Sequence, residues 1–387
     1  MSRWTGLVVV LAALAALGTL ASRPSWAKAA SGTPYTIGAI FSVTGDASSL
    51  GVPEKNTAAM LESAINAAGG VKGHPVRIVI EDDRGDPAEA LNAAKRLVER
   101  DKVLAIVGPT RTGTTLAIKD YMTQAKVPLI SCAAGVKIVE PLSPWVFKTP
   151  QSDRMAVERI ISYLKSKKIS RVGTISDNTS FGQGGLDELR KFLPKAKITI
   201  VDSEEYGPKD PSMESQIIKL RASKPQAVIC WGTPPGPAIV AKNMRQLALK
   251  VPLICSHGVA NDTFLRLAGT AANGVVLPAG RLLVYDQIPA THPQRKVLMD
   301  YAARYRKTYG QAPDTFGGHA WDAVFLVTGA LAKTGPDRAK LRAQLEHTKG
   351  FVGTGGIFTF SAADHNGLTP GAFEMVQVVD GKWKLLR

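Results

Sequence analysis

The sequence predicts an α/β protein made of two doubly wound, mostly parallel sheets. Short β-branched runs alternate with helical patterns from Tyr35 onward, and short turns connect them. The alternation stops once, in the aromatic and proline-rich segment 141–150, and then restarts as a second complete series. The 387 residues, 45% of them hydrophobic, are enough for two domains of ordinary size.

The first series is expected to contain four strands and the helices between them. Glycines at 69–70 end the first helical pattern, and Pro87 opens the second in the first turn, where proline is tolerated. The expected strands are 35–41, 76–80, 103–107 and 127–131, and the expected helices are 51–68, 87–100 and a third that starts near Gly113.

The elements of the second series and of the tail are predicted from the same hydrophobic periodicity. After a short strand at 145–147, the expected strands are 171–176, 198–201, 227–231, 251–255 and 275–277, with helices at 153–165, from the turn 181–184 to 192, at 213–222 and at 237–247. The tail is expected to hold helices at 293–309, 316–333 and 337–349, a strand at 357–360, and a hairpin of 373–379 and 383–386 joined at Asp380-Gly381.

The first residues have the pattern of a secretory signal peptide. Arg3 precedes the uncharged segment 4–22, and small residues around Ala27 fit a cleavage site. We therefore expect a soluble exported protein, located in the periplasm and cleaved near Ala27, with a retained membrane anchor as the alternative.

Composition and charge exclude several kinds of partner. The formal net charge is +16, but the basic residues are scattered and no aromatic residues interleave with them, so no nucleic-acid partner is expected. The three cysteines and six histidines lack metal-ligand spacing, so neither a metal nor another cofactor is expected. Cys230 and Cys255 end two strand-like runs, and both a disulfide and two buried thiols remain open for them.

One turn, within residues 103–116, has the features of an anion site. A strand ends at Gly108-Pro109, four threonines follow with Arg111 among them, and a helix begins. A strand, a small polar turn and a helix N-terminus together present free N–H groups to an anion at the edge where open sheets bind ligands. The alternative is an ordinary turn whose threonines cap the helix.

With these motifs in order, the chain resembles the periplasmic solute-binding proteins of the branched-chain (leucine/isoleucine/valine) amino acid type, the extracytoplasmic receptors of ABC importers. The resemblance covers nearly all of the chain after the signal peptide. The segments that carry it are 37–45, 66–73 with Asp82-Asp83, 107–109 with the threonines, 127–131, 181–184, and 356–360 followed by Asp364 and Gly367.

The resemblance implies a type I periplasmic binding protein, with two lobes that exchange strands and close on the ligand through a three-crossover hinge. The corresponding lobes here are 34–150 with 282–352, and 151–281 with 353–387. The resemblance also implies a permease partner in the membrane; we expect a monomer.

In that family a carboxylate of the ligand is held after the third and fourth strands. The matching positions here are Thr112, Ala133 and Gly135, with Ala134 in the same loop, and Gly135 departs from the family's threonine. Phe181 matches an aromatic residue that contacts the ligand from the second lobe, and Trp231 lies near the place of another.

His257 stands where the family's amino-acid binders place an acid for the ligand ammonium. A buried ammonium without a carboxylate costs several kcal/mol. His257 and Arg111 therefore favour an apolar or aromatic carboxylic acid over a branched-chain amino acid. Two alternatives stay open: an acid at 177, 202 or 262 replaces the missing partner, or Arg111 faces solvent and His257 is a satisfied loop residue.

We therefore expect the substrate-binding component of an ABC importer, which captures a small carboxylate-bearing ligand by hinge closure. An exported sensory module that signals its ligand state to a membrane receptor is the alternative. An enzyme is less favoured, because no nucleophile elbow, zinc-protease motif, phosphate loop or dinucleotide fingerprint is present.

Overall fold

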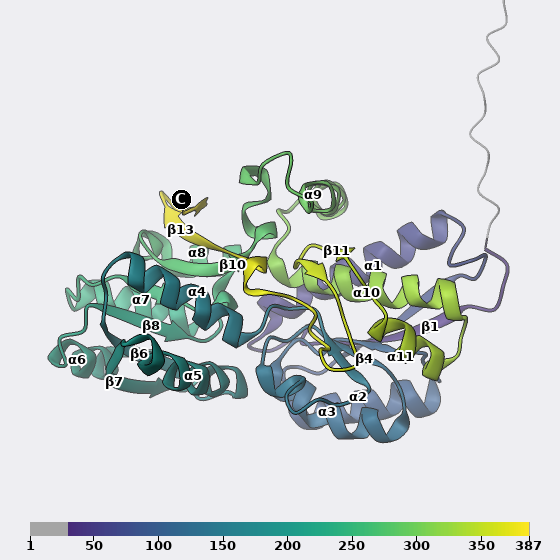
Figure 1. Cartoon of the computed structure of the whole chain (residues 1–387), viewed down its shortest axis with the longest axis horizontal. Coiled ribbons are helices and arrows are strands. Elements are labelled where there is room, and N and C mark those ends of the chain that lie inside the picture. The colour runs from purple at the N-terminus through teal and green to yellow at the C-terminus, as the bar shows by residue number, and fades with distance from the viewer. Residues whose placement is uncertain (1–29, 387) are drawn as a thin grey trace, which may run out of the picture.

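The structure is a computed structural model that describes residues 30–386, so the predicted signal peptide lies outside the described residues. Two α/β lobes lie side by side, each with its own sheet (Figure 1). Both sheets are mostly parallel, which confirms the predicted fold class. No helix of the described part is long and apolar enough to span a membrane.

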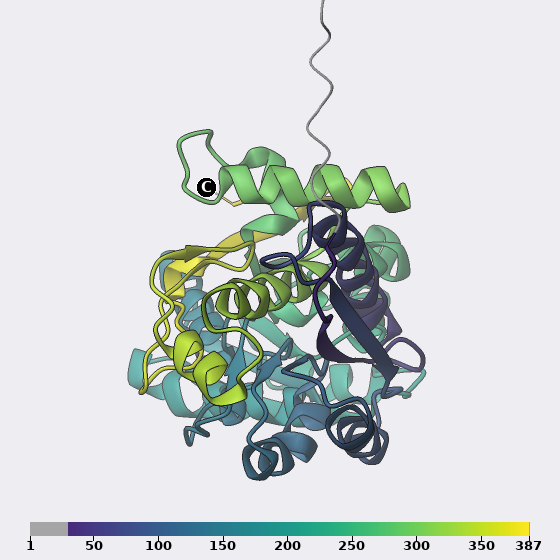
Figure 2. The same ribbon diagram turned by 90° about the vertical axis from the view of Figure 1, so that its right-hand side faces the viewer.

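The first sheet has five parallel strands in the order β2-β1-β3-β4-β5. Its strands are β1 (Tyr35–Phe41), β2 (Val76–Asp82), β3 (Ile106–Val107), β4 (Leu129–Ser131) and β5 (Val146–Lys148). Its helices are α1 (Ser48–Ala67), α2 (Pro87–Lys95), α3 (Thr112–Ala125), and two from the tail, α10 (Thr315–Thr334) and α11 (Arg338–Glu346). Figure 2 shows α1 in dark purple and α10 in yellow-green side by side.

The second sheet has seven strands in the order β14-β13-β10-β9-β8-β6-β7. Its strands are β6 (Arg171–Asp177), β7 (Thr199–Tyr206), β8 (Ala227–Trp231), β9 (Leu253–Cys255), β10 (Val276–Gly280), β13 (Phe373–Val379) and β14 (Lys382–Leu385). Its helices are α4 (Asp153–Ser166), α5 (Ser180–Phe192), α6 (Glu214–Ala222), α7 (Gly236–Gln246) and α8 (Asp262–Ala268). The antiparallel pairings of this sheet are β10 with β13 and β13 with β14.

The chain passes between the sheets three times. It crosses from β5 to α4, returns after β10 through a 3-10 segment (Arg281–Gln287) and α9 (Arg295–Tyr309), and crosses again before β13. The small hairpin of β11 (Phe351–Val352) and β12 (Ile357–Phe358) precedes the last crossing. Its turn is bonded to Asp322 of α10, which favours a third crossover after residue 360 over one at 352–353. The lobe boundaries stay a prediction.

Some expected elements have other bounds in the structure. β3 is shorter than 103–107, and the helix expected at 87–100 changes to a π-helical turn at Arg96–Arg100. Residues 181–184 lie inside α5, because the Thr179 side chain accepts from the N–H groups of Phe181 and Gly182 and so caps the helix before Ser180. Helix α8 was not expected; the Asn261 side chain caps it.

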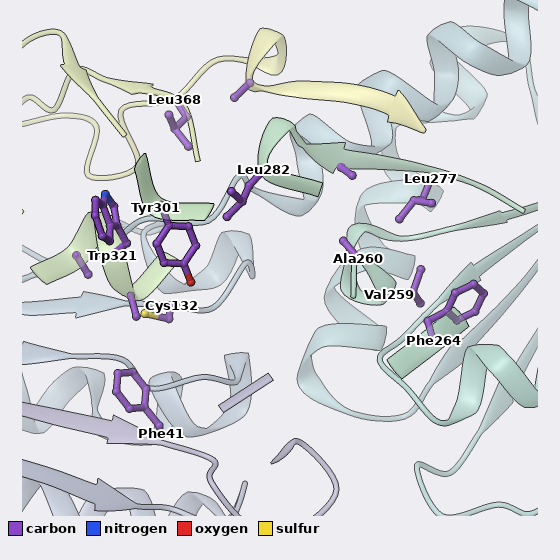
Figure 3. Close-up of a cluster of buried hydrophobic side chains, with 14 of the residues drawn as sticks. Phe41, Cys132, Val259, Ala260, Phe264, Leu277, Leu282, Tyr301, Trp321 and Leu368 are labelled. Atoms are coloured by element: carbon purple, nitrogen blue, oxygen red, sulfur yellow. The ribbon is translucent and has the colours of Figure 1, made fainter. Parts of the chain in front are cut away.

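The largest hydrophobic core is continuous between the lobes. Figure 3 shows Phe41 and Cys132 on the first-lobe side and Val259 and Phe264 on the second-lobe side, with Leu282 between them. Cys132, Cys230 and Cys255 are buried free thiols, and Cys230 lies opposite Cys255 in the register of β8 and β9. The adjacency is as expected, and the structure has thiols rather than a disulfide.

Candidate ligand-binding pocket

A pocket lies between the lobes, at the ends of strands from both sheets. It encloses about 590 Å³ that no atom fills, its mouth included. Loops after β3 and β4 and helix α10 line it from the first lobe, and loops after β6, β8, β9 and β10 from the second. Six of the eight predicted site residues are among the lining residues: Arg111, Thr112, Ala133, Ala134, Phe181 and His257.

The N-terminus of α3 opens on this pocket without a capping side chain. Arg111 has extended backbone geometry at the N-cap position, and its side chain makes no capping bond. Thr112, the first residue of the helix, is only 4% exposed, and its Oγ1 has no hydrogen-bond partner within residues 30–386. A helix N-terminus leaves its first N–H groups free, so this end suits an anion.

The other threonines of this turn have internal partners. Thr110 Oγ1 contacts the buried carboxyl of Glu54 and accepts from the N–H of Ser42. Thr114 Oγ1 donates to the carbonyl of Arg111 at 3.1 Å, and Thr115 Oγ1 lies 2.8 Å from Ser131 Oγ. Thr112 is therefore the hydroxyl of this turn that remains available to a ligand.

The loop after β4 supplies the facing backbone groups. The N–H of Ala133 donates to Ser131 Oγ at 3.1 Å and is already used. In the described part of the chain no hydrogen bond uses the N–H groups of Ala134 or Gly135. Gly135 lies just outside the pocket lining and packs against Thr112, where a Cβ would be 2.4 Å from Thr112 Cγ2. This contact explains why the family's threonine has no room here.

Aromatic rings form the second-lobe wall. Phe181, at the start of α5, meets the His257 ring edge-on with centroids 5.5 Å apart, and Phe373 lies 5.3 Å from His257 on another side. Trp231 is fully buried behind Phe181 and His257 and does not line the pocket. Gly185 of α5 packs against the Trp231 ring, so Trp231 supports the pocket wall from behind. Direct contact of Trp231 with the ligand was expected, and the structure corrects that expectation.

Two buried histidines line the pocket from opposite lobes. Sequence reasoning missed His319 of α10; the available signal was a histidine three residues after Phe316 on a buried helix face. Burial lowers the pKa of both His257 and His319 to about 3, and Lys148 acts in the same direction. Both rings are therefore neutral, and His257 Nδ1, His257 Nε2 and His319 Nδ1 have no partners in the described residues.

No carboxylate lines the pocket in the described part of the chain, and Arg111 is its one charged lining residue. Asp177 accepts from the backbone and side chain of Thr179, and Asp202 from the N–H of Ser203. Asp262 lies in a separate surface groove. None of the three acids considered as substitutes for the missing ammonium partner reaches the pocket lining.

Arg111 is half-buried at the edge of the pocket. One of its guanidinium nitrogens would lie 3.0 Å from a Cβ at Gly85 in the first lobe. Its charge also reaches Asp177 in the second lobe, where burial raises the pKa of the carboxyl and Arg111 partly offsets that rise. Arg111 therefore faces the cleft between the lobes.

Comparisons with known proteins agree with this architecture. A family model described as periplasmic binding protein matches residues 34–382. The Leu/Ile/Val-binding protein homolog 3 of Brucella melitensis is 24% identical over 351 residues, which cover 90% of this chain and 92% of the relative.

Solved structures agree as well. An extracellular ligand-binding receptor from Rhodopseudomonas palustris has a TM-score of 0.86 and 28% identity, covering 91% of this chain and 99% of its own. The branched-chain amino acid transporter substrate binding protein of Streptococcus pneumoniae, solved in complex with isoleucine, has a TM-score of 0.82 and 25% identity, covering 92% and 99%.

Proposed function

The chain belongs to the periplasmic binding protein family, and from that premise we propose that it captures a small carboxylic acid between its lobes for an ABC importer. Its relatives named Leu/Ile/Val-binding proteins and the neighbour solved with isoleucine support a ligand-binding receptor of the branched-chain amino acid type. The ligand class, the importer role and the residues that bind are our proposals.

The observation that supports a carboxylate ligand is the free hydroxyl of Thr112 at the uncapped N-terminus of α3. A buried hydroxyl without a partner is rare in folded proteins unless a ligand or water completes it. A carboxylate placed there accepts from Thr112 Oγ1, from the first N–H groups of α3, and from the N–H groups of Ala134 and Gly135. Arg111 adds positive charge at the mouth.

The same pocket disfavours an ammonium group. An amino acid brings a positive charge that must be paired when it is buried, and the pocket offers two neutral imidazoles in place of an acid. The remaining walls are aromatic and aliphatic. These features support an apolar or aromatic acid without an amine as the preferred ligand.

Calorimetric titration separates these ligand classes. We expect benzoate, phenylacetate or isocaproate to bind at one site per chain and to raise the unfolding temperature. Leucine, isoleucine and valine should bind at least about tenfold more weakly than the best acid, because of the unpaired ammonium. Tight binding of leucine with no response to any acid without an amine would contradict the proposal.

The remaining parts of the proposal rest on the family and on the sequence. The family supports a membrane permease as partner, a periplasmic location and a non-catalytic role. The sequence pattern supports cleavage near Ala27, and we expect a monomer. Reconstitution with a permease and ATPase tests the importer role, and ligand-dependent ATP hydrolysis is the expected result. Turnover of a bound acid by the purified protein would contradict the non-catalytic role.

A further inference from the structure

We propose that Lys148 is a positioning residue that aims and strengthens the Gly135 N–H for the ligand carboxylate, and that it couples capture of this carboxylate to proton uptake. This inference rests on the proposed function and adds to it the role of a buried lysine that lies behind the pocket wall. Lys148 does not line the pocket.

Lys148 is a fully buried lysine at the last position of β5. Its backbone pairs in register with Ser131 of β4, and its ammonium Nζ donates to the carbonyl oxygen of Ala134 at 2.5 Å. Within residues 30–386 no ion pair involves Lys148, and its one side-chain hydrogen bond goes to the loop that faces the ligand site.

The geometry of the peptide unit carries the effect of Lys148 to the pocket. In a trans peptide the C=O of one residue and the N–H of the next point in opposite directions. The bond between Ala134 and Gly135 is not among the cis peptides, and Lys148 holds the Ala134 carbonyl, so the Gly135 N–H of the same unit points away from Lys148. Ala134 lines the pocket and Lys148 does not. A cation on the carbonyl also polarises the unit and makes its N–H a stronger donor.

The counter-charge of Lys148 lies across the first crossover. Asp153, in the first turn of α4, is fully buried, and neither of its oxygens has a hydrogen-bond partner in the described residues. Its Oδ1 lies 3.9 Å from His257 Nε2. Lys148 and Asp153 thus place two opposite charges on either side of the hinge, directly behind the pocket.

The charges that face Lys148 come from several elements. The acids are Asp153 of α4 and, from two loops, Glu140 and Asp364. The neutral rings of His257 and His319 also face Lys148. Burial outweighs the three acids and lowers the pKa of Lys148 toward neutrality. Burial also raises the pKa of Asp153 toward neutrality, and Glu188 of α5 adds to that rise, while Lys148 and the backbone N–H of Val136 oppose it. A ligand carboxylate adds negative charge beside both groups and favours their protonated forms. Binding of an acid near neutral pH should therefore take up protons.

Matched pairs of acids and amides separate the effect of ligand charge on proton uptake from the effect of ligand shape. Phenylacetate with phenylacetamide, and isocaproate with isocaproamide, differ in charge but hardly in size. For the wild-type protein, calorimetry in two buffers of different ionisation enthalpy should detect uptake of a fraction of a proton by each acid that binds, and none by the amides. This measurement needs no variant.

The variants then assign the effect to Lys148. Lys148→Met should lower affinity for the acids about tenfold or more, the loss of one charge-assisted interaction, and should reduce the proton uptake. Affinity for the amides should change less than about threefold. Because Lys148→Met leaves Asp153 without its counter-charge, the double variant Lys148→Met/Asp153→Asn removes both charges and should fold with the same loss of preference for acids.

The outcomes are distinguishable. An unchanged ratio of acid to amide affinity in either folded variant overturns the inference, as does an acid that binds the wild-type protein without proton uptake; both leave the proposed function intact. If no acid binds the wild-type protein, the proposed function fails, and this inference fails with it.

Discussion

Gly135 and Thr112 are in direct contact across the two loops of the candidate carboxylate site. A Cβ on Gly135 would lie 2.4 Å from Thr112 Cγ2 and 3.0 Å from Thr112 Oγ1. The backbone of Gly135 has φ −53° and ψ 134°, which any residue adopts, so contact with Thr112 and not backbone strain requires glycine here.

Gly135→Ala should therefore damage the site while the backbone stays unstrained. The added methyl group displaces Thr112 and widens the gap between the two sets of donors, and we expect about a tenfold or larger loss of affinity for the best acid. Isothermal titration measures it. Gly329→Ala is the matched control: Gly329 lies exposed in α10 with nothing within 4 Å of a Cβ. This control should bind normally and be about 0.5–1 kcal/mol more stable.

Removal of the Thr112 hydroxyl should affect binding and not folding. Thr112→Val keeps the shape but loses the donor, and a hydrogen bond to a charged group contributes about 1.5–3 kcal/mol, or roughly 10- to 100-fold in affinity. Because Oγ1 has no partner in the described residues, the unfolding temperature should stay the same or rise. Thr112→Ser should retain most of the affinity. A valine variant that binds acids as well as the wild type would exclude Thr112 as a donor.

The two buried histidines should make the protein sensitive to acid. Their pKa values of about 3 in the folded state lie below the ordinary 6.5. As the pH falls below about 6.5 the unfolded chain binds protons that the folded protein does not, so stability is lost down to about pH 3. Each histidine contributes a slope of up to about 1.4 kcal/mol per pH unit in that window. Urea unfolding of His319→Gln should show a shallower slope than the wild type; equal slopes would mean that His319 is not held neutral.

Asp322 should be a main contributor to the stability of the β11–β12 hairpin, which precedes the third crossover. Its Oδ1 accepts from the N–H of Thr354 at 2.7 Å, and its Oδ2 accepts from the N–H of Gly355 at 2.7 Å. Asp322→Ala leaves both buried donors without partners, and we expect the free energy of unfolding to fall by about 3 kcal/mol or more. The control Asp300→Ala breaks an exposed pair with Arg304 and should cost no more than about 0.5 kcal/mol. Similar losses in both would contradict this role.

The three thiols should be protected in the folded protein. Cys132, Cys230 and Cys255 are all buried and free, and burial raises the pKa of Cys132 and Cys230 well above the ordinary value. A thiol reagent should label none of them in buffer and all three after unfolding, because the thiolate must be both formed and reached. Labelling of a single cysteine after unfolding without reductant would show that Cys230 and Cys255 are joined.

The sequence predicts the elements well because their signals are local. The strand at 35–41 and the hairpin with its Asp380-Gly381 turn are signalled by neighbouring residues. The strands at 35–41 and 373–379 have the expected bounds, and β14 is shifted by one residue. Boundaries set by caps and packing were less accurate. Thr179 caps α5, which starts at Ser180, before the turn expected at 181–184. Asn261 caps α8, a helix of seven residues that was not expected.

For the candidate site too, the sequence predicted some features and missed others. A strand-turn-helix pattern and a family resemblance pointed to Thr112, the loop at 133–135, Phe181 and His257, and these residues do converge on one cleft. What each side chain does there was not predictable, because hydrogen-bond partners come from distant segments. The partner of Ala134 is Lys148, and Trp231 lies behind Phe181 where the sequence suggested a ligand contact.

By itself, the sequence determined the α/β class, the two series of elements and the place of the anion turn, because periodicity and turn chemistry act over a few residues. Only the tertiary structure decided that the pocket lacks a lining carboxylate in the described part of the chain, and that His319 faces it from α10. It alone decided that Lys148 supports the loop beside Thr112. These contacts join residues from separate segments and from both lobes. Their interaction energies depend on burial in a shared cleft, which no local sequence pattern encodes.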